Sequence, residues 1–60
     1  MDKFKDYLLI KRGELGLTQK EFAKMIGYST PSLQKWENGQ EPKEVTKIRI
    51  RTILEGKKWN

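Results

Sequence analysis

One stretch of the chain combines polar side chains that could share a single face of a helix. A helical wheel with about 100° per residue places on that face Thr30, Pro31, Gln34, Lys35 and Asn38. A hydroxyl, two amides and an ammonium can donate or accept hydrogen bonds, but none is a ready nucleophile or general base. The chemistry to expect here is non-covalent recognition of a polar or anionic partner.

The composition argues against several other kinds of chemistry. Cysteine and histidine are both absent, which excludes disulfides, zinc sites and the usual nucleophile and base arrangements. No pair of carboxylates sits in a chain long enough to build a pocket. We therefore expect no catalytic residue, metal, cofactor or small-molecule ligand, and we do not expect an enzyme.

The net charge suits an anionic partner. Thirteen Lys and Arg against eight Asp and Glu give +5 and an isoelectric point near 9.7. Residues 43–60 hold six of the basic and two of the acidic groups. This C-terminal run could follow phosphates or only keep the domain soluble; its members are Lys47, Arg49, Arg51, Lys57 and Lys58.

The length of 60 residues allows one domain, residues 1–60, which buries too little surface to be more than marginally stable alone. Oligomerisation or a bound partner is then the expected stabiliser. No apolar run approaches the ~20 residues that cross a bilayer, and the N-terminal residues lack the apolar centre of a signal peptide. We expect a cytoplasmic location and no membrane contact.

Four helices are predicted, and the first runs from Asp2 to about Leu15. Its apolar stripe is formed by Phe4, Tyr7, Leu8 and Leu15, with Arg12 beside it. Leu9 and Ile10 fall outside the stripe, either as scattered surface residues or as part of an oligomer contact.

The second helix is predicted to begin after Thr18, which forms a capping box with Glu21. Gly27 ends it after eight residues, because a sharp turn commonly needs a left-handed residue. Its inner face consists of Phe22, Ala23 and Ile26.

The third helix is predicted to begin at Ser29-Thr30-Pro31 and to stop near Asn38-Gly39. Leu33 and Trp36 lie on its apolar face, opposite the polar face described above.

The segment after Pro42, residues 43–56, is ambiguous. Its apolar residues spread over more than half of a helical wheel, whereas residues 47–52 alternate like a half-buried strand. A lone strand would have no partner in this chain, so helix is favoured and strand stays the alternative.

Two short helices around a tight glycine turn are the geometry of a helix-turn-helix. The segment from Gln19 to Asn38 resembles the twenty-residue motif of the Xre family, which includes lambdoid phage repressors and Cro proteins. Alanine at the fifth place, glycine at the ninth and apolar residues at the fourth, eighth, tenth, fifteenth and eighteenth places agree. The flanks agree too, with Leu15-Gly16-Leu17-Thr18 before and Gly39 into Pro42 after. The resemblance implies a compact all-α, four-helix, lambda-repressor-like domain.

It also implies double-stranded operator DNA as the partner, read in the major groove by the third helix. Lys35 could donate to guanine N7 and O6, Gln34 could reach adenine or a phosphate, and Thr30 could serve either. Pro31 could contact a thymine methyl group, and it departs from the polar residue usual at this place. A pre-proline residue prefers extended backbone, which could shift the helix start by one residue.

Other residues are candidates for holding the DNA backbone. The start of the second helix at Gln19 offers amide groups and a positive helix end to a phosphate. The resemblance adds Asn38 with the loop through Gly39 and Gln40, and further candidates are Ser29 and Lys43. Arg12 and Glu37 correspond to the family's structural ion pair between the first and third helices.

The function expected from these residues is a phage-type or mobile-element-type repressor or Cro-like transcriptional regulator that binds DNA as a homodimer. The alternative is a protein-interaction module, such as an antitoxin or phage accessory factor, that docks through Leu9, Ile10 or the C-terminal segment.

Overall fold

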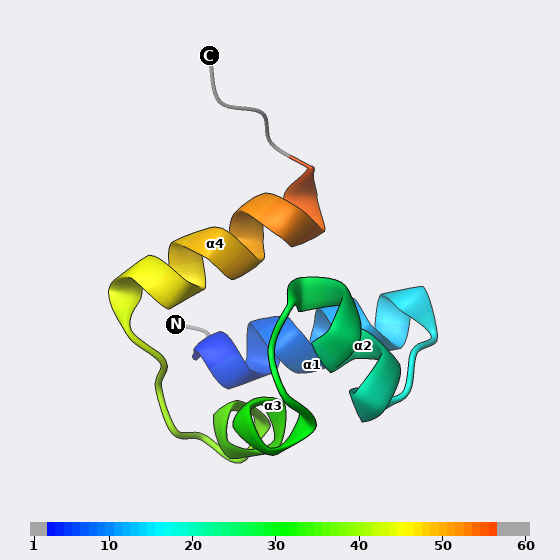
Figure 1. Ribbon diagram of the computed structural model, residues 1–60, viewed down its shortest axis with the longest axis horizontal. Coiled ribbons are helices and arrows are strands. Elements are labelled where there is room, and N and C mark those ends of the chain that lie inside the picture. The colour runs from blue at the N-terminus through cyan, green and yellow to red at the C-terminus, as the bar shows by residue number, and fades with distance from the viewer. Residues whose placement is uncertain (1–2, 57–60) are drawn as a thin grey trace.

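The computed structural model describes residues 3–56, and these residues form four helices without a strand. The helices are α1 (Phe4–Leu15), α2 (Gln19–Ile26), α3 (Thr30–Glu37) and α4 (Glu44–Glu55). In Figure 1, α1 crosses the middle of the molecule, α3 lies below it and α4 above it. The predicted all-α, four-helix fold is confirmed.

The first helix packs through its N-terminal half. Phe4 and Leu8 are buried, whereas Leu15 leaves 51% of its surface exposed. The predicted stripe is therefore wrong at its last residue. The helix ends there and the chain turns through Gly16, whose φ is +68°, so that Leu17 packs against the core in place of Leu15. Leu9 and Ile10 are exposed, as their position off the stripe predicts.

The second helix has the predicted boundaries. The amide of Glu21 donates to Oγ1 of Thr18 at 3.2 Å, and the amide of Thr18 donates back to Oε1 of Glu21 at 3.0 Å. At the other end Gly27 adopts a φ of +83°, a left-handed conformation that glycine reaches without steric cost. This turn lets the chain reverse at once into α3.

The core is formed where all four helices meet, and its fully buried centre is built by Leu8, Phe22, Ile26, Leu33 and Ile50. Trp36 is half-buried at the edge of this cluster, where its ring and that of Tyr28 pack in a T-shaped arrangement with centroids 5.1 Å apart. Both aromatic residues are thus packed, in agreement with their apolar places in the motif.

The segment after Pro42 is helical, which excludes the strand alternative for residues 44–55. Only a narrow face of α4 is covered: Ile50 is buried and Leu54 is half-buried. Val45 and Ile48 remain exposed on the opposite side, and Ile53 is exposed beside Ile50. The apolar residues spread around the wheel because α4 carries both a core face and an uncovered apolar face.

Polar and aromatic contacts fasten α4 to α1. The guanidinium of Arg51 lies 5.3 Å from the ring centre of Phe4 and 5.5 Å from that of Tyr7, within cation–π distance. The hydroxyl of Tyr7 donates to Oε2 of Glu55 at 2.7 Å. Burial and this bond to a carboxylate raise the pKa of Tyr7 to about 12.

Candidate nucleic-acid interface

The position of α3 is set by its N-cap. Oγ of Ser29 accepts a hydrogen bond from the amide of Ser32 at 3.3 Å and donates to Oγ of Ser32 at 2.9 Å. Pro31 lies in the first turn, where a missing N–H is no loss. The helix begins at Thr30 with Ser29 as its cap, so the proline does not displace the predicted start.

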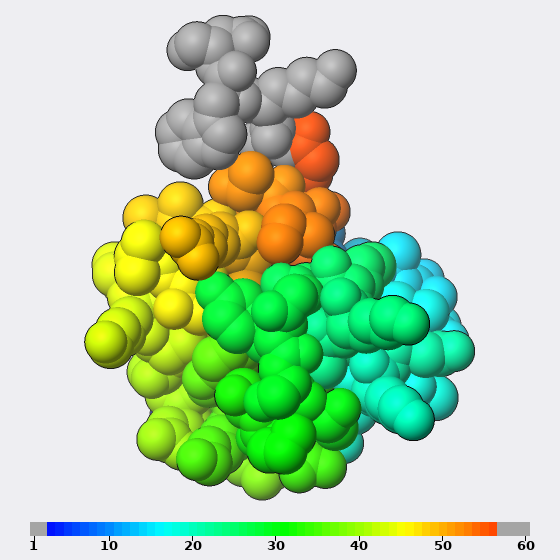
Figure 2. Space-filling view, viewed as in Figure 1, coloured from blue at the N-terminus to red at the C-terminus, as the bar shows by residue number. Residues whose placement is uncertain are grey.

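The outer side of α3 carries the polar residues that the helical wheel placed there. Pro31, Gln34, Lys35 and Asn38 are exposed, and Thr30 is half-buried. In Figure 2, residues of α3, coloured bright to yellowish green, form the lower part of the visible surface, while α4 lies above them. The structure therefore brings the five predicted residues to one accessible surface, which we call the α3 face.

The expected ion pair between α1 and α3 is present. Nε and Nη2 of Arg12 donate to the two carboxylate oxygens of Glu37 at 3.0 Å and 3.3 Å. Nη1 of Arg12 also donates to the carbonyl oxygen of Leu17 at 3.3 Å. Because the side chain of Glu37 is only 4% exposed, this pairing fixes the C-terminal end of α3 against α1.

Gln19 extends this ion pair to the surface. Nε2 of Gln19 donates to Oε1 of Glu37 at 2.8 Å, and Nε2 of Gln34 donates to Oε1 of Gln19 at 3.4 Å. From the sequence, Gln19 was predicted only as a phosphate ligand, and this connection was not foreseen. No spacing in the sequence reveals it, since the two glutamines meet only when α2 and α3 are packed.

The backbone amides at the start of α2 are a second group that could bind an anion, separate from the side chain of Gln19. The first amides of a helix have no acceptor within the helix, and here the first two belong to Gln19 and Lys20. The positive end of the helix dipole adds to their attraction for a phosphate.

The loop after α3 uses its amides internally. Asn38 donates to the carbonyls of Gln34 and Lys35, Gly39 donates to that of Trp36, and Gln40 donates to that of Lys35. Gly39 adopts a φ of +110°, a backbone conformation that favours glycine, so this residue allows the turn to form. The side chains of Asn38 and Gln40, both exposed, are the groups that remain for a phosphate.

Within residues 3–56, the basic residues of the C-terminal run do not form one patch. Lys47 pairs with Glu41 and Glu44, and the hydrogen bond from Lys47 holds the pKa of Glu41 below its usual range. Arg51 lies over the rings of α1, as described above. Of the other members, Arg49 is exposed, while Lys57 and Lys58 lie outside the described residues. Lys43, the N-cap of α4, is exposed.

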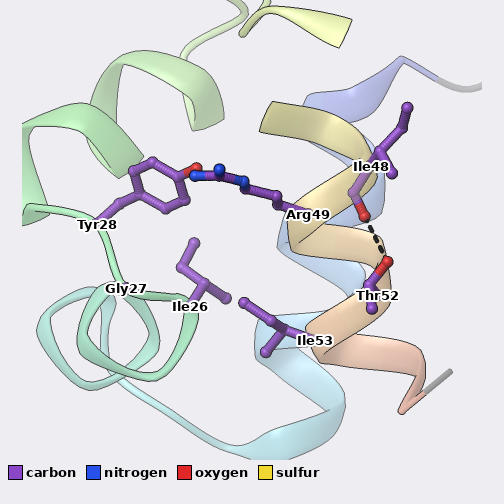
Figure 3. A pocket seen from close by; sticks show the side chains of 7 residues that line it. All are labelled: Ile26, Gly27, Tyr28, Ile48, Arg49, Thr52 and Ile53. Carbon is purple, nitrogen blue, oxygen red and sulfur yellow. Dashed lines mark hydrogen bonds between the residues drawn. The ribbon is translucent and has the colours of Figure 1, made fainter. Parts of the chain in front are cut away.

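A separate apolar groove of about 370 Å³ lies between the turn after α2 and the helix α4. Figure 3 shows Ile26 and Ile53 facing each other across it, with Arg49 reaching toward Tyr28 at one end. Arg49 of the basic run lines this groove, but no residue of the α3 face does. It is therefore distinct from the α3 face.

Comparison with known proteins gives one match. A family model described as helix-turn-helix matches residues 8–55, which covers α2, α3, α4 and the last eight residues of α1. No curated protein and no solved structure matches the chain. None of the four helices in residues 3–56 is long and apolar enough to cross a membrane.

Proposed function

Because the chain belongs to the helix-turn-helix family of the Xre and lambda-repressor type, we propose that it is a sequence-specific transcriptional regulator that reads operator DNA with α3. The observation that carries this proposal is the α3 face, where exposed donors and acceptors project from a helix whose opposite side is locked into the core. An α-helix has the diameter that the major groove admits, and only that groove distinguishes all four base pairs.

The roles follow from the chemistry of the side chains. Lys35 donates to guanine N7 and O6, Gln34 and Thr30 bond to base edges, and Pro31 contacts a thymine methyl group. Backbone phosphates are held at the start of α2 by Gln19, and by four further residues: Ser29, Asn38, Gln40 and Lys43. Arg12 and Glu37 have a structural role in this proposal, because their ion pair stabilises the angle between α1 and α3.

The length of α3 argues for a dimer. Eight helical residues extend ~12 Å, so one domain spans only ~3–4 base-pair steps. A homodimer with two-fold symmetry doubles the sequence that is read, and it requires half-sites about one helical turn, ~34 Å, apart. The regulator would repress by occupying the site that polymerase needs, in the manner of phage repressors and Cro proteins.

Selection of bound sequences from a random duplex library tests the proposal. We expect a palindromic consensus with half-sites one helical turn apart, bound at ~150 mM salt at least ~10³-fold more tightly than a scrambled duplex. Sedimentation of the complex should show two protein chains per duplex. Binding that is equally strong to all duplexes at this salt concentration would overturn the proposal.

A further inference from the structure

Glu37 sets the direction of a chain of hydrogen bonds that ends on the α3 face. Its carboxylate is paired with the guanidinium of Arg12, and a carboxylate in such a pair only accepts hydrogen bonds. The group 2.8 Å from its Oε1 must therefore be a donor. For Gln19 this means that the amide nitrogen faces Glu37 and that the amide oxygen faces away.

The same reasoning passes from Gln19 to Gln34. With its nitrogen committed to Glu37, Gln19 presents Oε1 to its neighbour, and Nε2 of Gln34 donates to that oxygen at 3.4 Å. Reversing the amide of Gln34 would bring two oxygens into contact and lose a hydrogen bond. The oxygen of Gln34 is thereby directed away from Gln19, on an exposed residue of the α3 face.

We propose that Glu37, acting through Gln19, makes Gln34 an acceptor toward DNA, so that it selects a base whose major-groove edge carries an amino group over one whose major-groove edge carries a carbonyl. This inference rests on the proposed function. A glutamine free to rotate its amide can satisfy either group, but a fixed oxygen accepts from adenine N6 or cytosine N4 and repels guanine O6 or thymine O4. Adenine is favoured most, because the remaining N–H of Gln34 can donate to adenine N7.

Gln19 and Glu37 are positioning residues in this account, and Gln34 alone touches the base. Gln19→Met tests the relay, because methionine keeps the length of the side chain, removes both polar atoms and leaves the Arg12–Glu37 pair in place. Lys20→Met is the matched control, since Lys20 is the exposed next residue of α2 and takes no part in the chain of hydrogen bonds. Thermal melting of both variants checks that they remain folded.

The experiment selects bound sequences from a random duplex library for the wild type and each variant. Gln34→Met first identifies the base that Gln34 reads, as the position whose preference disappears. We expect the wild type to select adenine or cytosine there. In Gln19→Met this preference should fall about tenfold at that position alone, whereas Lys20→Met should weaken all sequences equally.

A double variant separates the relay from a general loosening of the interface. In Gln19→Met/Gln34→Glu, residue 34 has only acceptor oxygens, so it should again select an amino base, at lower affinity, without any relay. Selection of guanine or thymine by the wild type, or an unchanged preference in Gln19→Met, would overturn the inference while leaving the proposed function intact. Enrichment of no sequence by the wild type would instead overturn the proposed function.

Discussion

Arg12 and Glu37 join the last turn of the chain's first helix to the last residue of its third through paired hydrogen bonds of 3.0 Å and 3.3 Å. The acidic side chain is almost fully buried, whereas the basic one is 27% exposed. The main effect of the pair is therefore to stabilise the buried carboxylate, because Glu37 would be costly to bury without the positive charge of Arg12. It also holds the end of α3 to which Gln19 is bonded.

Removal of Arg12 alone should lower the free energy of unfolding more than removal of both Arg12 and Glu37. Arg12→Met leaves the Glu37 carboxylate buried without its counter-charge, and we expect the free energy of unfolding to fall by about 3 kcal/mol. The double variant Arg12→Met/Glu37→Met should lose less, because no buried charge is left. Urea unfolding measures both, and a double variant less stable than the single one would contradict this account.

Two isoleucines on α4 should differ sharply in their contribution to stability. Ile50 is 0% exposed and Ile53 is 48% exposed. Ile50→Ala should cost about 3 kcal/mol, since it leaves a cavity in the core, whereas Ile53→Ala should cost less than about 1 kcal/mol. Thermal unfolding of the two variants compares them directly. Equal losses would mean that α4 does not pack through the face described here.

Two glycines should respond in opposite ways to substitution by alanine. Gly13 lies inside α1 with no atom within 4 Å of an added Cβ, so Gly13→Ala should stabilise the domain by about 0.5–1 kcal/mol. Gly27 has equal space but a φ of +83°, so Gly27→Ala should destabilise it by about 1–2 kcal/mol. The pair is compared by urea unfolding, and a stabilising Gly27→Ala would be inconsistent with the left-handed turn.

The raised pKa of Tyr7 makes stability fall at alkaline pH. The folded state holds the phenol proton more tightly than the unfolded state, because burial and the bond to Glu55 raise the pKa of Tyr7 from 10.0 to about 12. This contribution is complete below the unfolded pKa and is lost as pH rises toward the folded one. Between pH ~10 and ~12 the wild type should therefore lose more stability than Tyr7→Phe. If the free energy of unfolding falls equally with pH in the two proteins, the pKa of Tyr7 is not raised in the folded state.

The fold was accessible from the sequence because its signals are local. The capping box of Thr18 and Glu21 and the N-cap at Ser29 marked two helix starts correctly, since each depends on residues only three positions apart. Leu15 was misplaced because periodicity alone does not reveal where neighbouring helices stop covering α1. The resemblance to the Xre family supplied the Arg12–Glu37 pair, which joins residues 25 positions apart.

The details of the site depend on packing and were less accessible. The bond between Gln19 and Gln34 exists only because α2 and α3 meet at a particular angle. The basic residues of α4 looked equivalent in sequence, yet Lys47 and Arg51 turn toward α1 while Arg49 is exposed beside the groove. Side-chain direction on α4 was undetermined as long as residues 43–56 could be helix or strand.

The most direct test of the central claim, that the α3 face reads DNA, is the affinity of wild type and Lys35→Ala for the selected duplex and for single base-pair changes in it. Lys35 is an exposed residue of that face. We expect the variant to bind the selected duplex about tenfold or more weakly and to lose discrimination at one guanine only. Equal affinity of the two proteins for every duplex would contradict the account.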